Sequence, residues 1–300
     1  MVYTTVRREA SWTCLLLLIL GPSCKGGGGP TQPKPPAVRT TGILFASTRD
    51  VNQPEIYVMN PDGTNIARLT NNAAHDDEAV WSPDGNRIAY HGEGDDIWVM
   101  NADGSTATRL GNSGADQHPQ WSPGGTRIAW LGTLAVVPGT GDILIMDADG
   151  GSKQHMNQVS ASDFGWSADG AKVAYTTGGG LLVVVNADGS DSTLIFSETN
   201  ASIWDPRFSP DRTRVAFGLS SSSNGNQFDV YLVNADGTNL KRLTTDPAWD
   251  TNPVWSPDGT KLVFASQRDG NQLVWMMNAD GTNQVRISSR PGGDIPSSWR

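Results

Sequence analysis

The sequence predicts an all-β protein, a six-bladed β-propeller with four antiparallel strands in each blade. A motif of an aromatic residue followed by Ser-Pro-Asp-Gly, or a close variant, occurs five times, and its aromatic residue returns a sixth time near the end of the chain. A second motif, Asn-Ala-Asp-Gly or a close variant, occurs six times in step with the first. The period of about 44 residues is typical of propellers and other repeat arrays. The chain also has 34 Gly residues, which suits many tight turns.

Each repeat contains the same succession of strands. An apolar strand such as "ILFAS" (43–47) comes first, and a second strand such as "EIYVM" (55–59) follows after a loop. A short third strand, clearest as "ARLT" (67–70), follows the Asp-Gly turn, and the last strand leads into the aromatic motif. The two long strands are rich in β-branched and aromatic residues, as strands are. Four such strands in about 44 residues match one propeller blade.

Both motifs contain turns. In the second motif the turn aspartates are Asp62, Asp103, Asp149, Asp188, Asp236 and Asp280. Asp initiates such a turn, and the Gly that follows takes a positive φ at no steric cost. We therefore interpret these aspartates, and likewise Asp84, Asp169 and Asp258 of the first motif, as turn formers rather than ligands.

The two ends of the predicted propeller, 42–300, complement each other. The domain starts without a strand that leads into an aromatic motif, and it ends in "DIPSSW", such a strand without the turn that normally follows. An isolated blade leaves both faces open, and only neighbouring blades can cover them. We therefore expect the C-terminal strand to complete the first blade beside Ile43–Ser47, which removes the free ends of the ring.

Residues 1–24 have the features of a secretory signal peptide. Arg7 and Arg8 precede the apolar run "CLLLLIL" (14–20), which is too short to span a bilayer. Cys24 stands where a bacterial lipoprotein signal has its lipid-accepting cysteine, although plain cleavage and release is the competing interpretation. We expect export to the periplasm or cell surface, with lipidation at Cys24 as the contact with the membrane.

The segment 25–41 is rich in Gly and Pro and is predicted to be a linker. Five basic residues and Glu9 precede residue 42, which leaves 17 basic and 30 acidic residues in the predicted propeller, a net charge of −13. This balance argues against nucleic acid as a partner. It favours cations and basic peptide surfaces, or serves only solubility.

The repeats resemble the WD-like β-propeller repeat of TolB-like periplasmic proteins over essentially all of 42–300. The third repeat departs in its outer strand, "SKQHMN", and the fourth has Phe208 and Arg212 in place of Trp and Gly. The resemblance implies protein–protein interaction at the channel mouth in the cell envelope. TolB-like proteins also have an N-terminal α/β domain without a counterpart in this sequence, so the resemblance does not by itself imply a place in the Tol–Pal system.

Candidate binding residues precede each aromatic residue on the innermost strand. Five positions before it stand Asp76, Asp116, Ala161, Ile203, Asp250 and Asp294, and three positions before it stand Glu78, His118, Asp163, Asp205, Asn252 and Pro296. Because strand side chains alternate, we expect the two positions to share the face toward the channel. The result would be an acidic channel mouth, which repels itself until a cation or a basic partner binds.

The alternative for each aspartate is a structural role in capping a turn or pairing with a neighbouring blade. If the acidic mouth binds a metal ion, hard carboxylate oxygens suit Ca²⁺, with ligands among Asp76, Glu78, Asp116, Asp250 and Asp294. Trp204 and Trp249 precede the inner-strand aspartates closely and are expected near the mouth. There they would stack on a ligand or partner side chain, or simply pack within loops.

Two functions from different classes remain open. The favoured one is a non-catalytic binding module that docks an envelope protein or peptide, or a glycan, at the channel mouth. The alternative is a metal-dependent polysaccharide lyase or hydrolase, because some related propellers are such lyases. Only His75 and His118 lie near the expected mouth, and no Gly-x-Ser-x-Gly motif or phosphate-binding Gly-rich loop is present. We therefore expect a protein that is not an enzyme, with Ca²⁺ as its only candidate cofactor.

Overall fold

The computed structural model describes residues 40–111, 116–132, 141–289 and 292–300, without the side chains of 157–159. The predicted signal peptide, Cys24 and nearly all of the predicted linker lie outside these residues. The described part of the chain contains six four-stranded antiparallel sheets and one short 3₁₀ helix, η1 (Ser222–Asn224). Within that part, no helix is long and apolar enough to cross a membrane. The prediction of an all-β, six-bladed propeller is confirmed.

The blades follow the chain order from the first repeat onward. The first blade is β24 (Ile295–Trp299), β1 (Ile43–Ser47), β2 (Glu55–Met59) and β3 (Ala67–Arg68). The second is β4 (Asp77–Trp81), β5 (Arg87–Gly92), β6 (Asp96–Asn101) and β7 (Thr108–Arg109). The third is β8 (Gln117–Trp121), β9 (Arg127–Gly132), β10 (Gly141–Asp147) and β11 (Gln154–Ala161).

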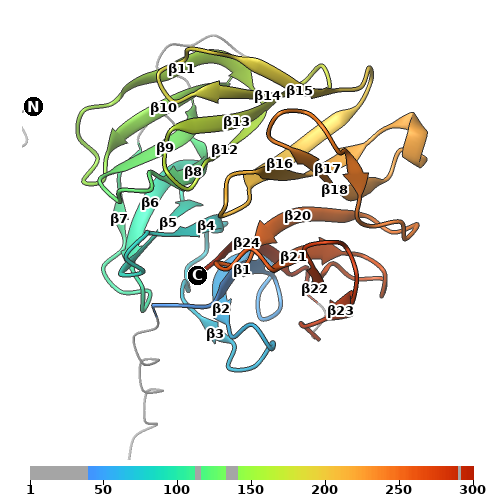
Figure 1. Ribbon diagram of the computed structural model, residues 1–300. Helices are drawn as coiled ribbons and strands as arrows, with labels where there is room; N and C mark the ends of the chain where they lie inside the picture. Colours follow the sequence, from blue (N-terminus) through green and yellow to red (C-terminus); the bar gives the residue numbers. More distant parts are fainter. Residues whose placement is uncertain (1–39, 112–115, 133–140, 290–291) are drawn as a thin grey trace, which may run out of the picture. The chain divides into compact units, whose positions relative to one another are not determined.

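The second half of the ring repeats the same order. The fourth blade is β12 (Asp163–Trp166), β13 (Lys172–Thr177), β14 (Leu181–Asn186) and β15 (Thr193–Ser197). The fifth is β16 (Ser202–Phe208), β17 (Arg214–Ser220), β18 (Phe228–Asn234) and β19 (Lys241–Arg242). The sixth is β20 (Asp250–Trp255), β21 (Lys261–Ser266), β22 (Leu273–Asn278) and β23 (Val285–Arg286). The first strands of the blades, β4, β8, β12, β16 and β20, together with β24, surround the centre of the ring (Figure 1).

The hydrophobic core lies between the blades rather than within them. Six clusters of buried side chains occur, and each combines residues from two successive sheets. Leu44 and Val58 of the first blade, for example, pack with Trp81 and Tyr90 of the second. The indole N–H of Trp81 also donates to the carbonyl oxygen of Gly42 across this interface (3.0 Å). The repeated aromatic residue is therefore part of the seam between neighbouring blades.

The Asp-Gly turns are built as the motif predicts. In the first blade, the backbone N–H of Thr64 donates to Asp62 Oδ1 (3.0 Å). Gly63 has φ 79°, and a Cβ atom there would lie 2.0 Å from the carbonyl oxygen of Ile287 in the sixth blade. Glycine is thus required both by the left-handed backbone and by the close approach of the neighbouring blade.

The third repeat, whose outer strand departs from the sequence pattern, also has irregular strand pairing there. The pairing of β10 with β11 shifts register twice, first between Gly141 and Ile143 and then between Ile143 and Leu144. In the fourth repeat's motif, Arg212 takes the place of the turn glycine and has φ 66°. Neither departure interrupts the ring.

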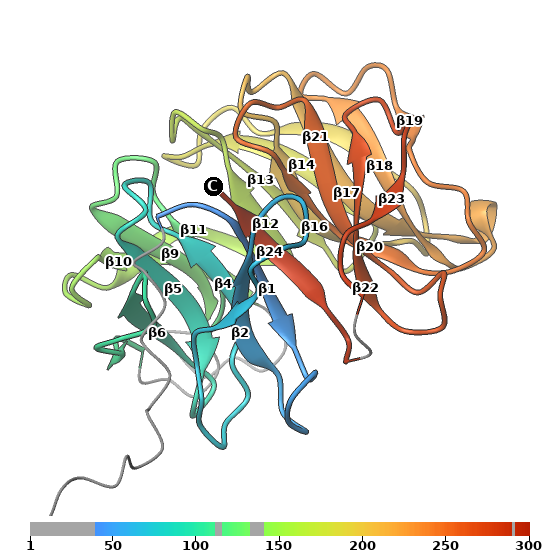
Figure 2. The same ribbon diagram turned by 90° about the horizontal axis from the view of Figure 1, so that it is seen from below.

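The C-terminal strand completes the first blade, as predicted. β24 pairs with β1, with Trp299 opposite Ile43, and the two strands lie side by side (Figure 2). Backbone hydrogen bonds join Gly42 and Arg300 in both directions, at 2.7 and 3.1 Å. At the other end of the pair, Asp294 accepts hydrogen bonds from Ser47 (2.6 Å) and from Arg49 (2.6 Å). The ends of the described domain are therefore held together by a single pair of strands.

The buried ion pair at this closure predicts a large effect of one substitution. The side chains of Arg49 and Asp294 are 2% and 0% exposed. Asp294→Ala should therefore destabilise the protein by about 3–5 kcal/mol, because it leaves a buried guanidinium without a counter-charge. Thermal unfolding should show a fall in Tm of roughly 10 °C.

The exposed pair of Asp269 and Arg286 provides the matched control. Their N–O distance is 2.7 Å, and their side chains are 41% and 45% exposed. Asp269→Ala should cost less than about 1 kcal/mol, since water screens this pair. Equal melting temperatures for the two variants would contradict the structural importance of the closure.

Candidate functional site

Four of the six inner strands have a bulge three residues before the aromatic residue. Glu78, His118, Asp205 and Asn252 have φ values of 52°, 53°, 53° and 53°. Near each of them, the pairing with the second strand of the blade shifts register. A bulge inserts an extra residue and interrupts the alternation of side chains. The two candidate positions on these strands therefore do not share a face, contrary to the prediction.

The position five before the aromatic residue points into the blade. Asp76, Asp116, Asp250 and Asp294 are at most 2% exposed. Asp116 accepts a hydrogen bond from the Trp130 indole (2.7 Å), Asp250 from Arg268 (2.6 Å) and Asp76 from Asn72 (2.7 Å).

The structure does not place these four aspartates at the channel mouth, and that part of the prediction is corrected. Their carboxylates join loops and strands within a blade, and those of Asp76 and Asp250 also reach Thr70 and Thr244 of the preceding blade, which is the structural alternative considered above. Among the five suggested Ca²⁺ ligands, Glu78 alone lines the central pocket described next.

A pocket of about 600 Å³ opens where the inner strands meet, and we call it the channel pocket. Its lining includes Glu78, His118, Asp205, Asn252 and Pro296, all from the position three before the aromatic residue. Trp204 and Trp249 also line it, as predicted for the mouth. Two positions were expected to face the channel, and the one three residues before the aromatic residue supplies residues of the pocket lining. The volume of the pocket is typical of ligand sites.

Polar side chains in the channel pocket, together with the buried Asp163, join neighbouring blades. Glu78 Oε2 accepts a hydrogen bond from the backbone N–H of His118 in the next blade (2.6 Å). In the same way, Asp163 Oδ2 accepts from the backbone N–H of Asp205 (2.7 Å). Asn252 Nδ2 then donates to Asp205 Oδ2 (2.9 Å). These five residues, which we call the channel network, connect the second blade through to the sixth.

The channel network is also electrostatically coupled. His118 Nδ1 lies 3.3 Å from Glu78 Oε1 and 3.6 Å from Asp163 Oδ1. Burial would lower the pKa of His118, but these two carboxylates outweigh it and raise the pKa. Burial raises the pKa of Glu78, and burial together with the charge of Asp163 raises that of Asp205 to about 6. Asp205 therefore changes protonation near pH 6.

An aromatic cluster borders the network. Trp204 and Trp249 are 55% and 48% exposed, and Phe228 lies between them with ring centroids at 6.0 and 5.6 Å. Sequence analysis did not identify Phe228. Phe228 could have been found as an aromatic residue just before "DVYLVN", because the corresponding residues of the other five repeats are not aromatic: Pro54, Asp95, Gly141, Gly180 and Gln272. Exposed aromatic side chains of this kind are the usual anchors for bound ligands.

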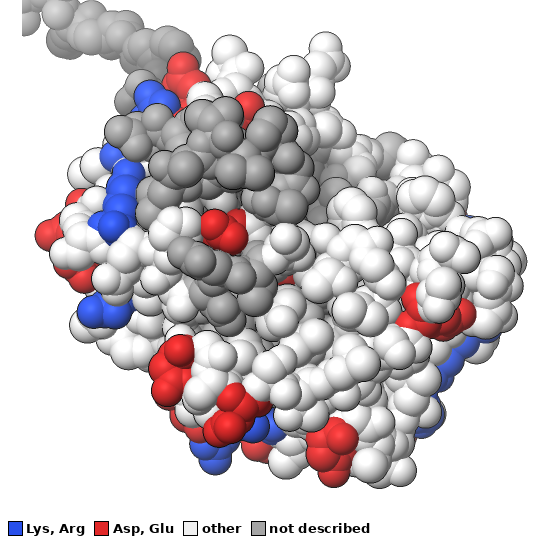
Figure 3. Space-filling view, turned by 90° about the horizontal axis from the view of Figure 1, so that it is seen from above, with Lys and Arg blue, Asp and Glu red and all other residues white. Residues whose placement is uncertain are grey.

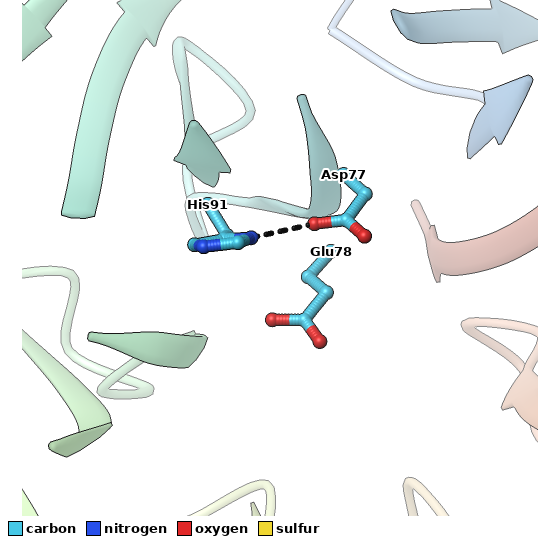
Figure 4. A group of neighbouring side chains, drawn as sticks. All are labelled: Asp77, Glu78 and His91. Atoms are coloured by element: carbon cyan, nitrogen blue, oxygen red, sulfur yellow. Dashed lines mark hydrogen bonds and ion pairs between the residues drawn. The ribbon is translucent and has the colours of Figure 1, made fainter. Parts of the chain in front are cut away.

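A second polar cluster lies at the start of β4. Asp77 Oδ2 is 2.7 Å from His75 Nε2, and Asp77 Oδ1 is 2.9 Å from His91 Nδ1 (Figure 4). Although burial opposes it, these two hydrogen bonds lower the pKa of Asp77 to about 2. The carboxylate of Glu78, the next residue, lies on the same side of β4 as the carboxylate of Asp77 (Figure 4). Sequence analysis missed Asp77 and His91 as a pair, because they come together only through the register of β4 and β5.

Charged side chains are scattered over one face of the ring. On the side over β11 and β15, acidic and basic side chains of the described residues both appear, at separate places (Figure 3).

The chain matches known proteins over most of its length. The family described as "TolB beta propeller domain" matches residues 35–137 and 126–299. Among curated relatives, the Tol-Pal system protein TolB of Anaeromyxobacter dehalogenans (strain 2CP-C) is 29% identical over 169 residues, which are 53% of this chain and 37% of the relative. The chain therefore spans little more than a third of the length of that relative.

Solved structures share the fold. A putative TolB from Agrobacterium tumefaciens aligns with a TM-score of 0.71 and 21% identity, and the alignment covers 86% of this chain and 93% of that one. An oligogalacturonate lyase in complex with manganese aligns less well, with a TM-score of 0.54, 18% identity and coverage of 82% and 73%. At these identities the likeness shows the fold alone.

The raised pKa of Asp205 predicts a pH-dependent stability. A carboxyl group with a raised pKa stabilises the folded state at low pH, and this contribution is lost as the pH rises through about 6. Relative to the wild type, Asp205→Asn should therefore gain about 1 kcal/mol in free energy of unfolding between about pH 5 and pH 7.5. Urea unfolding at the two pH values measures this difference.

Asp258→Asn is the control for this measurement. Hydrogen bonds from Ser256 and Thr260 lower the pKa of Asp258 to about 2, below the range tested. The stability difference between this variant and the wild type should stay constant over the range. A constant difference for Asp205→Asn as well would mean that Asp205 titrates normally in the folded protein.

Proposed function

The chain belongs to the TolB β-propeller domain family, and from this premise we propose that it is a non-catalytic binding module of the cell envelope. Its occupant would be a segment of an envelope protein or peptide, seated at the channel pocket. The observation that carries this proposal is the exposed aromatic cluster beside the pocket. Two tryptophans about half exposed in the lining of a largely apolar pocket have the composition of a binding hot spot.

The chemistry of the pocket favours a segment with both apolar and basic side chains. Trp204, Phe228 and Trp249 offer aromatic faces, on which an apolar or cationic side chain can rest. Asp77 and Glu78 line the same pocket and offer carboxylates, with 26% and 29% of their side chains exposed. The negative charge of the domain would attract such a segment over a longer range.

The proposed location follows from the N-terminal sequence and from the family. Residues 1–24 carry the signal-peptide features, and Cys24 is the proposed lipid-accepting residue. Relatives are named as Tol-Pal system proteins, which supports an envelope protein as the partner. We propose a periplasmic or cell-surface protein whose contact with the membrane is a lipid anchor at Cys24.

The second candidate function is a metal-dependent polysaccharide lyase or hydrolase. Such an enzyme requires that three or more metal-ligating side chains converge at one end of the channel. Asp77, Glu78 and His91 offer such a group. Asp116 and His118 do not form such a group, since Asp116 is buried against Trp130. A cluster of ligands alone does not supply substrate groups, so binding stays the favoured function.

Removal of either exposed tryptophan should weaken binding. A display library of peptides can be selected on the wild-type protein, and the affinity of the selected peptides measured by fluorescence anisotropy. Trp204→Ala and Trp249→Ala should each raise Kd by about tenfold or more, as for other aromatic anchors. Selected peptides should combine apolar with basic residues.

Leu194→Ala is the matched control, because Leu194 is a similarly exposed apolar residue (55%) on the outer strand β15. It should leave Kd unchanged. Peptides that bind both tryptophan variants as tightly as the wild type would count against docking at the channel pocket. Enrichment of oligosaccharides rather than peptides in a parallel glycan screen would replace the peptide with a glycan as the occupant.

A further inference from the structure

Three ligand-type side chains converge at the wall of the channel pocket. One oxygen each from Asp77 and Glu78 and one ring nitrogen of His91 all lie within 4.8 Å of one another. The bulge in β4 explains how two successive residues reach the same point. With Glu78 at φ 52°, the normal alternation fails, and both carboxylates lie within reach of His91, which pairs with Asp77 across β4 and β5 (Figure 4).

The far nitrogen of His91 provides an independent observation. The residue is 9% exposed, and its Nε2 is buried without a hydrogen-bond partner among the described residues. The carboxylate of Asp95 lies 3.7 Å from this nitrogen, beyond a normal hydrogen bond. A metal-bound histidine usually donates its other N–H to a carboxylate, which fixes the tautomer. Asp95 stands where its carboxylate could accept this hydrogen bond, while Nδ1, the other ring nitrogen of His91, faces the acidic ligands.

His75 contacts the cluster through Asp77. Its Nε2 lies 2.7 Å from Asp77 Oδ2, while the other oxygen of Asp77 faces His91. A ligating carboxylate is itself usually held by a hydrogen bond in this way. The cluster therefore contains both potential ligands and the groups that orient them, which a simple ion pair between His and Asp does not require.

We propose that Asp77, Glu78 and His91 bind one divalent transition-metal ion, with Zn²⁺ as the best-matched ion. One imidazole nitrogen with two carboxylate oxygens is a ligand set suited to zinc, and three protein ligands leave a coordination position open. Asp77 and Glu78 line the channel pocket, so a bound ion would lie beside the space where a partner would sit. The cation would also offset the charges of the adjacent carboxylates.

The test is a calorimetric titration of Zn²⁺ into the protein after treatment with a chelator. The wild type should bind one equivalent, and saturating Zn²⁺ should raise its Tm. His91→Gln and Asp77→Asn should each raise the Kd for Zn²⁺ at least tenfold. Circular dichroism establishes whether each variant is folded, and Glu78→Gln provides a third ligand variant if one of the others is not.

His155→Gln is the matched control. His155 Nδ1 lies 3.2 Å from Asp142 Oδ2 in the third blade, and among the described residues this His–Asp pair belongs to no group of three ligands. This variant should bind Zn²⁺ like the wild type. His118→Gln tests the neighbouring alternative, in which the ion would lie between Glu78 and Asp163.

The proposal is overturned if the wild type shows no saturable binding of Zn²⁺. It is overturned equally if His91→Gln and His155→Gln bind alike, or if His118→Gln abolishes binding and His91→Gln does not. Because the titration contains no peptide, a negative result leaves docking at the channel pocket untouched. Loss of peptide binding in the tryptophan variants likewise does not affect the outcome here.

Discussion

The structure depends on one constraint, which is that a four-stranded blade cannot bury both of its own faces. Each of the six core clusters takes its side chains from two successive blades, so every blade contributes to two clusters. Burial of apolar surface therefore stabilises the closed ring over an open one, because an open ring would expose two such faces to water. The pairing of β24 with β1 is the contact that closes it.

The constraint also explains how polar groups come to lie at the centre. The inner strands converge there, and the bulges in four of them turn polar side chains toward the channel. Left-handed backbone at Glu78 and His118 costs of order 1–2 kcal/mol for each residue, since neither is glycine. Their hydrogen bond across the blade boundary offsets part of that cost. Strain of this kind, repeated at one position around a pocket, is typical of functional sites.

Much of the fold could be predicted from the sequence, because its signals are local and repeated. Asp62 and Gly63 specify a turn by their own chemistry, and the unmatched ends of 42–300 indicate how the ring closes. The candidate site was only half predictable. Asp76 and Glu78 stand two residues apart, where alternation would place them on one face, yet a bulge that no glycine in the sequence indicates separates them, as it does most such pairs. The contact between Asp77 and His91 depends on the register of two strands, which is a property of the folded sheet.

The meeting of Gly42 and Arg300 has a consequence for the topology of the chain. Because backbone hydrogen bonds hold these two residues together, a short peptide could join them, and the chain could instead be opened in an exposed turn of another blade. Circular permutants of that kind would keep all six seams between blades. The order of blades around the axis, rather than the point at which synthesis starts, is what defines this architecture.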